Sequence, residues 1–139
     1  MAEESYDQLV NRGIALAQNE EYGEAIRLLK QAIELDDDQP DAHYNLAVIY
    51  GRLAMSDLGA EDYFEDHVDE EILLQSAIEE YQRVIELDPL HLAAHNNLAT
   101  IFALHGEREL AIHELEISLD IEPDQPEVVE QLQELQGSV

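Results

Sequence analysis

With 139 residues, the chain is long enough to bury one modest hydrophobic core and too short for two domains of ordinary size. Its hydrophobic content of 45% argues against a disordered chain, and the absence of cysteine excludes disulfides and thiolate metal sites. One lysine and five arginines face 33 acidic residues, and the resulting net charge of −27 excludes a protein that binds nucleic acid or an anionic membrane through phosphates.

The amino terminus gives no sign of export. Its first ten residues, MAEESYDQLV, lack the basic start and apolar run of a signal peptide, and no apolar run in the chain approaches the length of a membrane span. The lack of cysteine favours a reducing compartment. We therefore expect a soluble, cytoplasmic protein without nucleic-acid or membrane partners.

The strong negative charge has two competing explanations. One is a basic partner that is attracted by the electrostatic field of the protein. The other is a halophilic adaptation to a salt-rich cytoplasm, where ions screen the repulsion between carboxylates. Lysine is nearly absent from the whole chain, whereas a basic partner needs only one acidic face, so we favour adaptation to high salt.

One pattern of alanine and large apolar residues recurs in three segments of the chain, which are residues 21–40, 76–91 and 109–126. Ala25, Ala77 and Ala111 fall in register when these segments are aligned. The separation from Ala77 to Ala111 is 34 residues, and that from Ala25 to Ala77 is 52, or 34 plus an insertion of 18. Such a period indicates an array of supersecondary units that bury their apolar faces on one another.

Each unit contains two helical periodicities joined by a turn. In the first unit, Leu9, Gly13 and Leu16 share one helix face, and Ala25 and Leu29 share a face of the following helix. A small residue at Gly13 and at its equivalents lets the two helices approach closely. Proline or a cluster of aspartates ends each second helix, so the pattern predicts three helical hairpins.

This spaced pattern resembles the tetratricopeptide repeat (TPR) family over about residues 6–125. The chain departs from the family pattern at His43 and His95, where tryptophan is usual, at Arg12, where leucine is usual, and at Asp37, where proline is usual. The resemblance implies an all-α fold, a right-handed superhelix of three helix-turn-helix repeats in a single domain over residues 1–139. We expect the repeats at about residues 6–39, 40–91 with the 18-residue insertion, and 92–125, followed by a capping helix at 126–136.

The insertion lies inside the second repeat. Its apolar phase predicts that the first helix runs on to Met55 and that the second begins near Asp66, which makes an extended hairpin with its tip at residues 56–65. Tyr63 and Phe64 in this tip are candidates for a hairpin contact. They either anchor a partner or a second copy, or fold back over the hairpin, which is the more ordinary outcome.

His43 and His95 occupy equivalent places, and the pattern predicts that both face inward. A metal site is conceivable because His91 lies four residues before His95, but the sequence places no third ligand near them. We expect each imidazole to pack like a small aromatic ring and to hydrogen-bond a neighbouring carbonyl or carboxylate. No metal and no cofactor are expected.

In the TPR family the exposed face of the first helices lines a concave groove that binds peptides or helices. Alignment gives eighteen such positions here, of which only Asp7, Asp41 and Arg52 are ionic, for a net charge of −1 that leaves −26 for the other residues. Either this strip is a contact surface, or its positions are half-buried between helices. The residues expected to contact a peptide are Asn11, Ile14, Gln18, Tyr44, Asn45, Val48, Arg52, Asn96, Asn97, Thr100 and Leu104.

Three asparagines, Asn11, Asn45 and Asn97, hold the same place in the three repeats, and a ladder of amides can bind a peptide backbone whatever its side chains. Some family members use basic residues to clamp a C-terminal carboxylate. The matching places here hold Val10, Ile14 and Ala93. We therefore expect affinity from apolar contacts and backbone hydrogen bonds instead of a clamp of that type.

Catalysis is not expected, because the chain has no cysteine nucleophile, no glycine-rich phosphate loop and no recognised serine–histidine arrangement. The preferred function is a non-catalytic protein–protein interaction scaffold that binds a peptide or protein segment in the groove. The alternative is a structural self-assembly module, for example a homodimer, joined through the ends of the array or through the long hairpin.

Overall fold

The computed structural model of the protein describes residues 3–56 and 70–137, so the expected hairpin tip with Tyr63 and Phe64, and the helix start expected near Asp66, lie outside the described residues. The described residues form the helices α1 (Tyr6–Gln18), α2 (Tyr22–Leu35), α3 (Pro40–Met55), α4 (Glu70–Leu87), α5 (Leu92–Leu104), α6 (Arg108–Ile121) and α7 (Pro126–Gly137). The expected all-α fold is confirmed.

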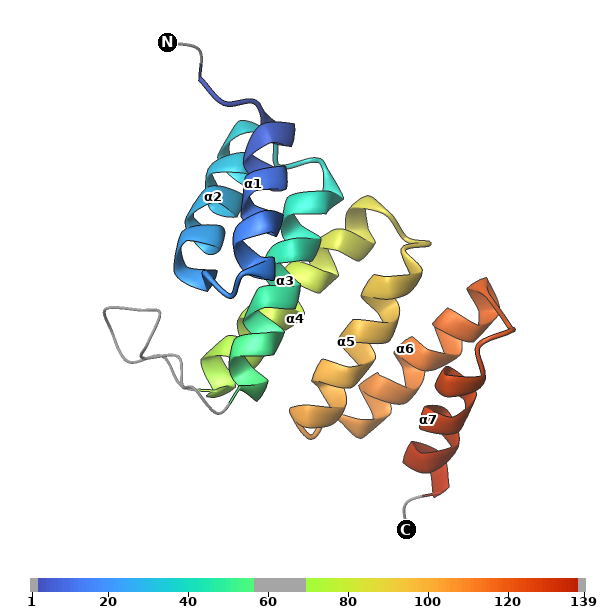
Figure 1. The fold of residues 1–139 in the computed structure, drawn as a ribbon. Helices are drawn as coiled ribbons and strands as arrows, with labels where there is room; N and C mark the ends of the chain where they lie inside the picture. The colour runs from blue at the N-terminus through green and yellow to red at the C-terminus, as the bar shows by residue number, and fades with distance from the viewer. Residues whose placement is uncertain (1–2, 57–69, 138–139) are drawn as a thin grey trace.

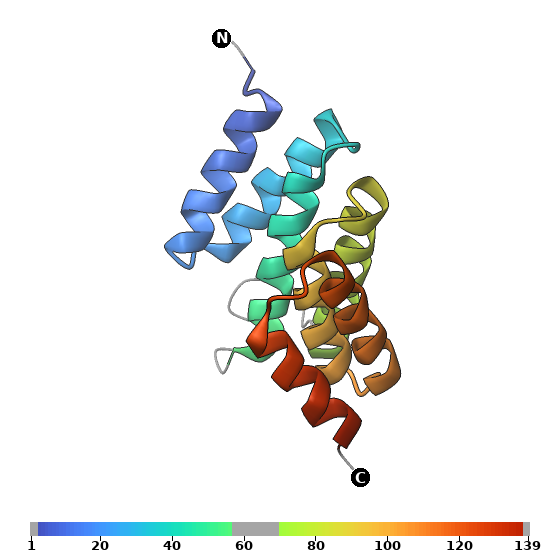
Figure 2. The same cartoon turned by 90° about the vertical axis from the view of Figure 1, so that its right-hand side faces the viewer.

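The helices pack as three successive hairpins, α1 with α2, α3 with α4, and α5 with α6 (Figure 1). The hairpins stack because α2 contacts α3 and α4 contacts α5. Contacts of α1 with α3 and of α3 with α5 place the first helices in one layer. The helix α7 packs on α6, and the two termini lie at opposite ends of this solenoid (Figures 1 and 2).

Local signals set the helix starts. Ser5 and Gln8 form a capping box on α1, in which the Gln8 N–H donates to Ser5 Oγ at 3.2 Å and the Ser5 N–H donates to Gln8 Oε1 at 2.9 Å. Pro40 stands in the first turn of α3, where its missing N–H is not needed. The imidazole of His91 caps α5, because its Nδ1 accepts the Ala94 N–H at 3.1 Å.

Small residues bring the two helices of a hairpin together. Ala25, Ala77 and Ala111 are fully buried at the helix–helix contacts. On the opposite helix of the first hairpin, a Cβ atom added to Gly13 would lie only 2.9 Å from Cγ of Leu29, closer than carbon atoms pack. The first hairpin therefore depends on glycine at this position.

The second hairpin is longer than its neighbours. Its helices α3 and α4 have 16 and 18 residues, whereas α1 and α5 have 13 and α2 and α6 have 14. Leu53, Leu73 and Leu74 are buried where the hairpin lengthens, while Met55 and Ile72 remain largely exposed. The lengthened part therefore has apolar contacts of its own.

The turns inside the first and third hairpins contain one residue with left-handed backbone at equivalent places. This residue is Gly106 in the third hairpin, with φ of 83°, and Glu20 in the first, with φ of 62°. In both turns the next N–H donates back to a helix carbonyl at 2.8 Å, so the two turns have the same form. The left-handed conformation costs a residue with a Cβ roughly 1–2 kcal/mol, a cost that glycine avoids.

Replacing Glu20 by glycine should therefore stabilise the protein. Because Glu20 is exposed, Glu20→Gly should raise the free energy of unfolding by about 0.5–1 kcal/mol, and the converse change Gly106→Ala should lower it by about 1 kcal/mol. Urea unfolding followed by circular dichroism measures both. A destabilised Glu20→Gly, or a Gly106→Ala variant as stable as the original protein, would contradict the assigned turn.

His95 is buried as predicted and joins three parts of the third hairpin. Its ring is only 2% exposed; Nδ1 lies 2.6 Å from a carboxylate oxygen of Glu114 on α6, and Nε2 lies 2.8 Å from the carbonyl oxygen of Pro89 before α5. Both ring nitrogens face oxygen acceptors. The imidazolium form donates a hydrogen bond to both acceptors, whereas either neutral tautomer donates to only one of them. The ring links the two helices and the preceding turn.

His43 repeats this arrangement in the second hairpin. Its Nδ1 lies 2.6 Å from Glu80 Oε2, and its Nε2 lies 3.2 Å from the carbonyl oxygen and 3.0 Å from Oδ1 of Asp37. The carboxylates are more exposed here than the Glu114 carboxylate is, at 62% for Asp37 and 25% for Glu80 against 14%. Water can therefore replace the His43 contacts more easily than those of His95.

Replacement of the histidines by phenylalanine should destabilise the protein in a defined order. His95→Phe keeps the ring but leaves the mostly covered Glu114 carboxylate and the Pro89 carbonyl without their donor, which should cost about 2 kcal/mol. His43→Phe should cost less, because its partners are more exposed, and the exposed His113→Phe should cost under about 0.5 kcal/mol. Urea unfolding measures all three, and equal losses would contradict the bonding role assigned to His95.

Candidate peptide-binding groove

Two adjoining hollows follow the layer of first helices. One lies between α1 and α3 and has a volume of about 230 Å³; the other lies between α3, α4 and α5 and has a volume of about 290 Å³. Tyr44, Val48 and Arg52 line both hollows, because residues four apart share one face of α3. The two hollows, with the stripe of Tyr44, Val48 and Arg52 between them, form the surface that we call the groove.

Most of the residues expected to contact a peptide lie in the groove. Eight of the eleven line it, and they are Ile14, Gln18, Tyr44, Asn45, Val48, Arg52, Asn97 and Thr100. The groove also has lining residues outside the expected set. These are Ala17, Ile49, Gly51, Met55, Tyr81 and Ile101. Tyr81 comes from the second helix of its hairpin, so reasoning from the first helices alone missed it.

The structure places Asn96 differently from the expectation. Its Nδ2 donates to Gln125 Oε1 at 3.0 Å, and its Oδ1 accepts the hydroxyl of the buried Ser118. Gln125 donates in turn to Ser118 Oγ at 3.0 Å. The polar atoms of Asn96 are therefore used between α5, α6 and the turn before α7, and Asn96 lines neither hollow of the groove.

Two other expected residues lie outside the groove. Asn11 is exposed on α1 and lines neither hollow. Leu104, which is 49% exposed, lines a separate hollow at the end of α5 together with Leu74 and His105. The expected ladder of three asparagines is thus reduced to Asn45 and Asn97.

These two asparagines have partners inside the protein. Asn45 Nδ2 donates to the carbonyl oxygen of Asp41 at 2.8 Å, and Asn97 Nδ2 donates to the Tyr44 hydroxyl at 3.2 Å. An amide group has a second N–H and a carbonyl oxygen besides. Asn97 also hydrogen-bonds the Tyr81 phenol. One bond therefore holds Asn45 and two hold Asn97, and each amide keeps polar capacity for a peptide backbone.

The aromatic residues of the groove support one another. The Tyr44 ring stands edge-on to the Tyr81 ring, with centroids 6.1 Å apart, and lies 4.8 Å from the His91 ring. Burial raises the pKa of the Tyr81 phenol, while its hydrogen bond with Asn97 and the positive charge of Arg52 act in the opposite direction. The Tyr81 hydroxyl is therefore protonated at neutral pH.

The charge of the groove differs in sign from that of the molecule. Arg52 is the one charged side chain among the described residues that line the groove, since Asp7 and Asp41, which the alignment had included, line neither hollow. The lining therefore carries one positive charge in a protein whose net charge is −27.

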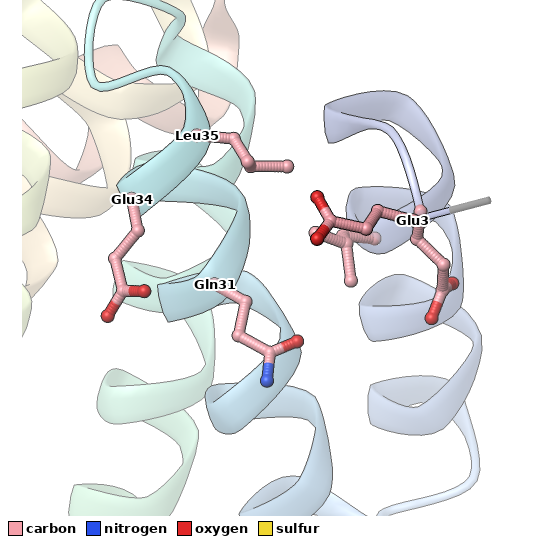
Figure 3. Close-up of a pocket in the computed structure, with 6 residues that line it drawn as sticks. Glu3, Gln31, Glu34 and Leu35 are labelled. Carbon is pink, nitrogen blue, oxygen red and sulfur yellow. The ribbon is translucent and has the colours of Figure 1, made fainter. Parts of the chain in front are cut away.

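A further hollow, of about 410 Å³, lies at the N-terminal end of the array. Figure 3 shows Glu3 of the N-terminal segment across an opening from Gln31, Glu34 and Leu35 of α2, and Glu4 also lines it. A second copy docked here by a two-fold axis would bring two sets of these carboxylates together, which is repulsive. This end surface therefore gives no support to the self-assembly alternative.

Within residues 3–56 and 70–137, no three histidine or acidic side chains gather closely enough to hold a metal ion. The helices described for these residues include none with the length and apolar character needed to cross a membrane.

The repeat pattern of the chain matches two family models. A family model described as a TPR repeat matches residues 13–53, and a second, described as a tetratricopeptide repeat, matches residues 74–126. The two models leave much of the insertion unmatched. A sequence comparison with curated proteins gives no match.

Solved structures with this arrangement of helices include the first TPR domain of Spaghetti (RPAP3) bound to an HSP90 peptide, with 18% identity, a TM-score of 0.79 and coverage of 96% of this chain and 92% of that one. The second TPR domain of human RPAP3, in complex with an HSP70 peptide, has 19% identity, a TM-score of 0.74 and coverage of 92% of both chains.

The TPR protein YrrB, described as having an unusual peptide-binding site, has 24% identity, a TM-score of 0.70 and coverage of 94% of this chain and 58% of that one. At sequence identities of 18% to 24%, the likeness between these structures and this chain is a likeness of fold alone. Because two models of one repeat match both sides of the insertion and the helices stack as paired hairpins, the chain belongs to the tetratricopeptide repeat family.

Proposed function

We propose that the protein is a non-catalytic scaffold that binds an extended segment of a partner protein in the groove. The observation that carries the proposal is a pair of adjoining hollows that share Tyr44, Val48 and Arg52 and are lined by apolar, amide and hydroxyl side chains, with one charge, on a molecule that is otherwise strongly acidic. Two of the similar structures are described with bound HSP90 and HSP70 peptides, which supports a peptide as the class of ligand.

The groove has the parts that an extended peptide requires. Its two hollows, about 230 and 290 Å³, are smaller than the roughly 300–1,000 Å³ of sites for small molecules, and each suits one side chain of a peptide. Buried Ile49 and Ile101 give them apolar floors. Asn45 and Asn97 lie beside these floors and offer donors and acceptors to a peptide backbone.

Catalysis finds no support in the same surface. The described residues that line the groove include no carboxylate, histidine, cysteine or serine, so neither a general base nor an activated nucleophile faces a bound segment. The proposal accordingly assigns binding alone to the groove.

Removal of the two amides should weaken peptide binding without unfolding the protein. For peptides selected from a phage-displayed random library and synthesised with a fluorescent label, Asn45→Ala with Asn97→Ala should raise Kd about tenfold, since each lost hydrogen bond contributes about 0.5–1.5 kcal/mol. Fluorescence anisotropy measures Kd, and circular dichroism checks that helicity is kept.

The control is a double replacement of exposed amides outside the groove, Gln82→Ala with Gln133→Ala, which should leave Kd unchanged. Equal affinity of the original protein and the groove variant would refute the proposal. Light scattering over a concentration series tests the self-assembly alternative, which requires a rise in mass that the groove variant does not alter.

We also propose that the acidic surface is an adaptation to a saline cytoplasm. Every hairpin and α7 carry acidic residues, with more on α2, α4 and α6 than on α1 and α3 and none on α5, so the charge extends along the whole array instead of being gathered on the face of one hairpin. A single basic partner would require only one such face. Lysine is depleted over the whole chain, in which it occurs once.

Salt should consequently stabilise the protein strongly. As ionic strength rises from about 0.1 M to about 2 M, the screening length falls from roughly 10 Å to less than 3 Å, so repulsion between neighbouring carboxylates is relieved. The melting temperature in potassium chloride should rise by about 10 °C or more over this range. A melting temperature that does not change with salt would favour the basic partner as the reason for the charge.

A further inference from the structure

We infer that the groove selects a peptide in which an aspartate or glutamate lies between two apolar residues, and that Arg52 binds the acidic side chain. This inference rests on the proposed peptide-binding function and specifies its ligand. Arg52 differs in two respects from Arg12, Arg27 and Arg83: it has no ion-pair partner among residues 3–56 and 70–137, and it lies between two apolar hollows.

No carboxylate of the described residues pairs with Arg52, although the chain has 33 acidic residues. Three other arginines do form ion pairs within the described residues. These pairs are Arg12 with Glu4, Arg27 with Glu24, and Arg83 with Asp37, Asp38 and Glu86. A guanidinium group binds a carboxylate through two parallel N–H donors, so Arg52 offers a pair of donors to a carboxylate from outside.

The position of Arg52 defines where that carboxylate lies along a peptide. Arg52 lines both hollows, with Ile14 and Ala17 on one side and Met55 and Ile101 on the other. Packed helices are about 8–10 Å apart, so hollows on the two sides of α3 are separated by a similar distance. An extended chain advances about 3.3 Å per residue, which places the apolar side chains about three residues apart, with the acidic residue between them.

A basic residue fits the groove poorly despite the overall charge. A lysine bound there would meet Arg52 and no carboxylate of the groove lining. The many distant carboxylates act through solvent and are screened beyond roughly 10 Å at about 0.1 M salt, whereas Arg52 would touch the ligand directly. Direct contact with Arg52 therefore favours an acidic ligand over a basic one.

The test uses an array of short fluorescent peptides that carry two leucines three positions apart, with glutamate, glutamine or lysine at one position between them. Both peptide ends are blocked, so no terminal carboxylate is present. The original protein should bind the glutamate peptides about fivefold more tightly than the glutamine peptides, and the lysine peptides least tightly. Fluorescence anisotropy at about 0.15 M potassium chloride measures the three affinities.

Variants at two arginines test whether Arg52 causes the preference for glutamate peptides. Arg52→Gln should abolish the difference between glutamate and glutamine peptides while both still bind, and Arg52→Glu should make the lysine peptide the preferred ligand. Arg27→Gln, at an exposed position on α2 outside the groove, should keep the preference of the original protein. Circular dichroism confirms that the variants are folded.

Equal affinities for glutamate and glutamine peptides, or a preference that survives Arg52→Gln, would overturn the inference. If those peptides still lose affinity through Asn45→Ala with Asn97→Ala, the groove remains a peptide site and only the ligand assignment fails. A second set of the same peptides with a free C-terminus completes the test: binding by that set alone would overturn the inference and assign Arg52 to a terminal carboxylate. Self-association that Arg52→Gln abolishes would assign the groove to a second copy, and absence of binding by any peptide would refute the proposed function as well.

Discussion

The close approach of the two helices within each hairpin is the constraint on which the rest of the structure depends. Gly13 faces Leu29 without room for a Cβ atom, and fully buried alanines take the corresponding contacts of the later hairpins. Close packing keeps the hairpins similar in thickness, so they stack with their first helices in one layer. In that layer, side chains of α1, α3 and α5 meet and line the two adjoining hollows of the groove.

Charge and packing act together at this groove. Elsewhere the surface is crowded with carboxylates that repel one another, and the groove lining excludes them while retaining Arg52. Half-burial between helices is enough to disfavour a carboxylate at some of these positions, because a charge there loses water. Half-burial does not explain why Arg52 has no ion-pair partner among the described residues, since carboxylates of those residues pair with Arg12, Arg27 and Arg83.

Much of the fold was predictable from the sequence because the repeat is a local pattern. A hydrophobic period and small residues at fixed spacing predict helices and hairpins without knowledge of distant contacts. The groove residues of α3 were predictable for the same reason. The position of Asn96 was not, because its bonds to Ser118 and Gln125 arise only when α6 and the turn before α7 fold against α5. The left-handed Glu20 had no signal, since glutamate is not a usual residue for that conformation.

In the proposed complex an extended peptide lies across α1, α3 and α5. The most direct measurement is amide chemical-shift mapping of the labelled protein, titrated with a peptide selected for binding. We expect shifts concentrated at groove residues such as Val48, Asn97 and Thr100, with little change around the N-terminal hollow or on α7. Shifts concentrated at Leu35 and its neighbours, or an unchanged spectrum around Val48 at saturation, would contradict the proposed complex.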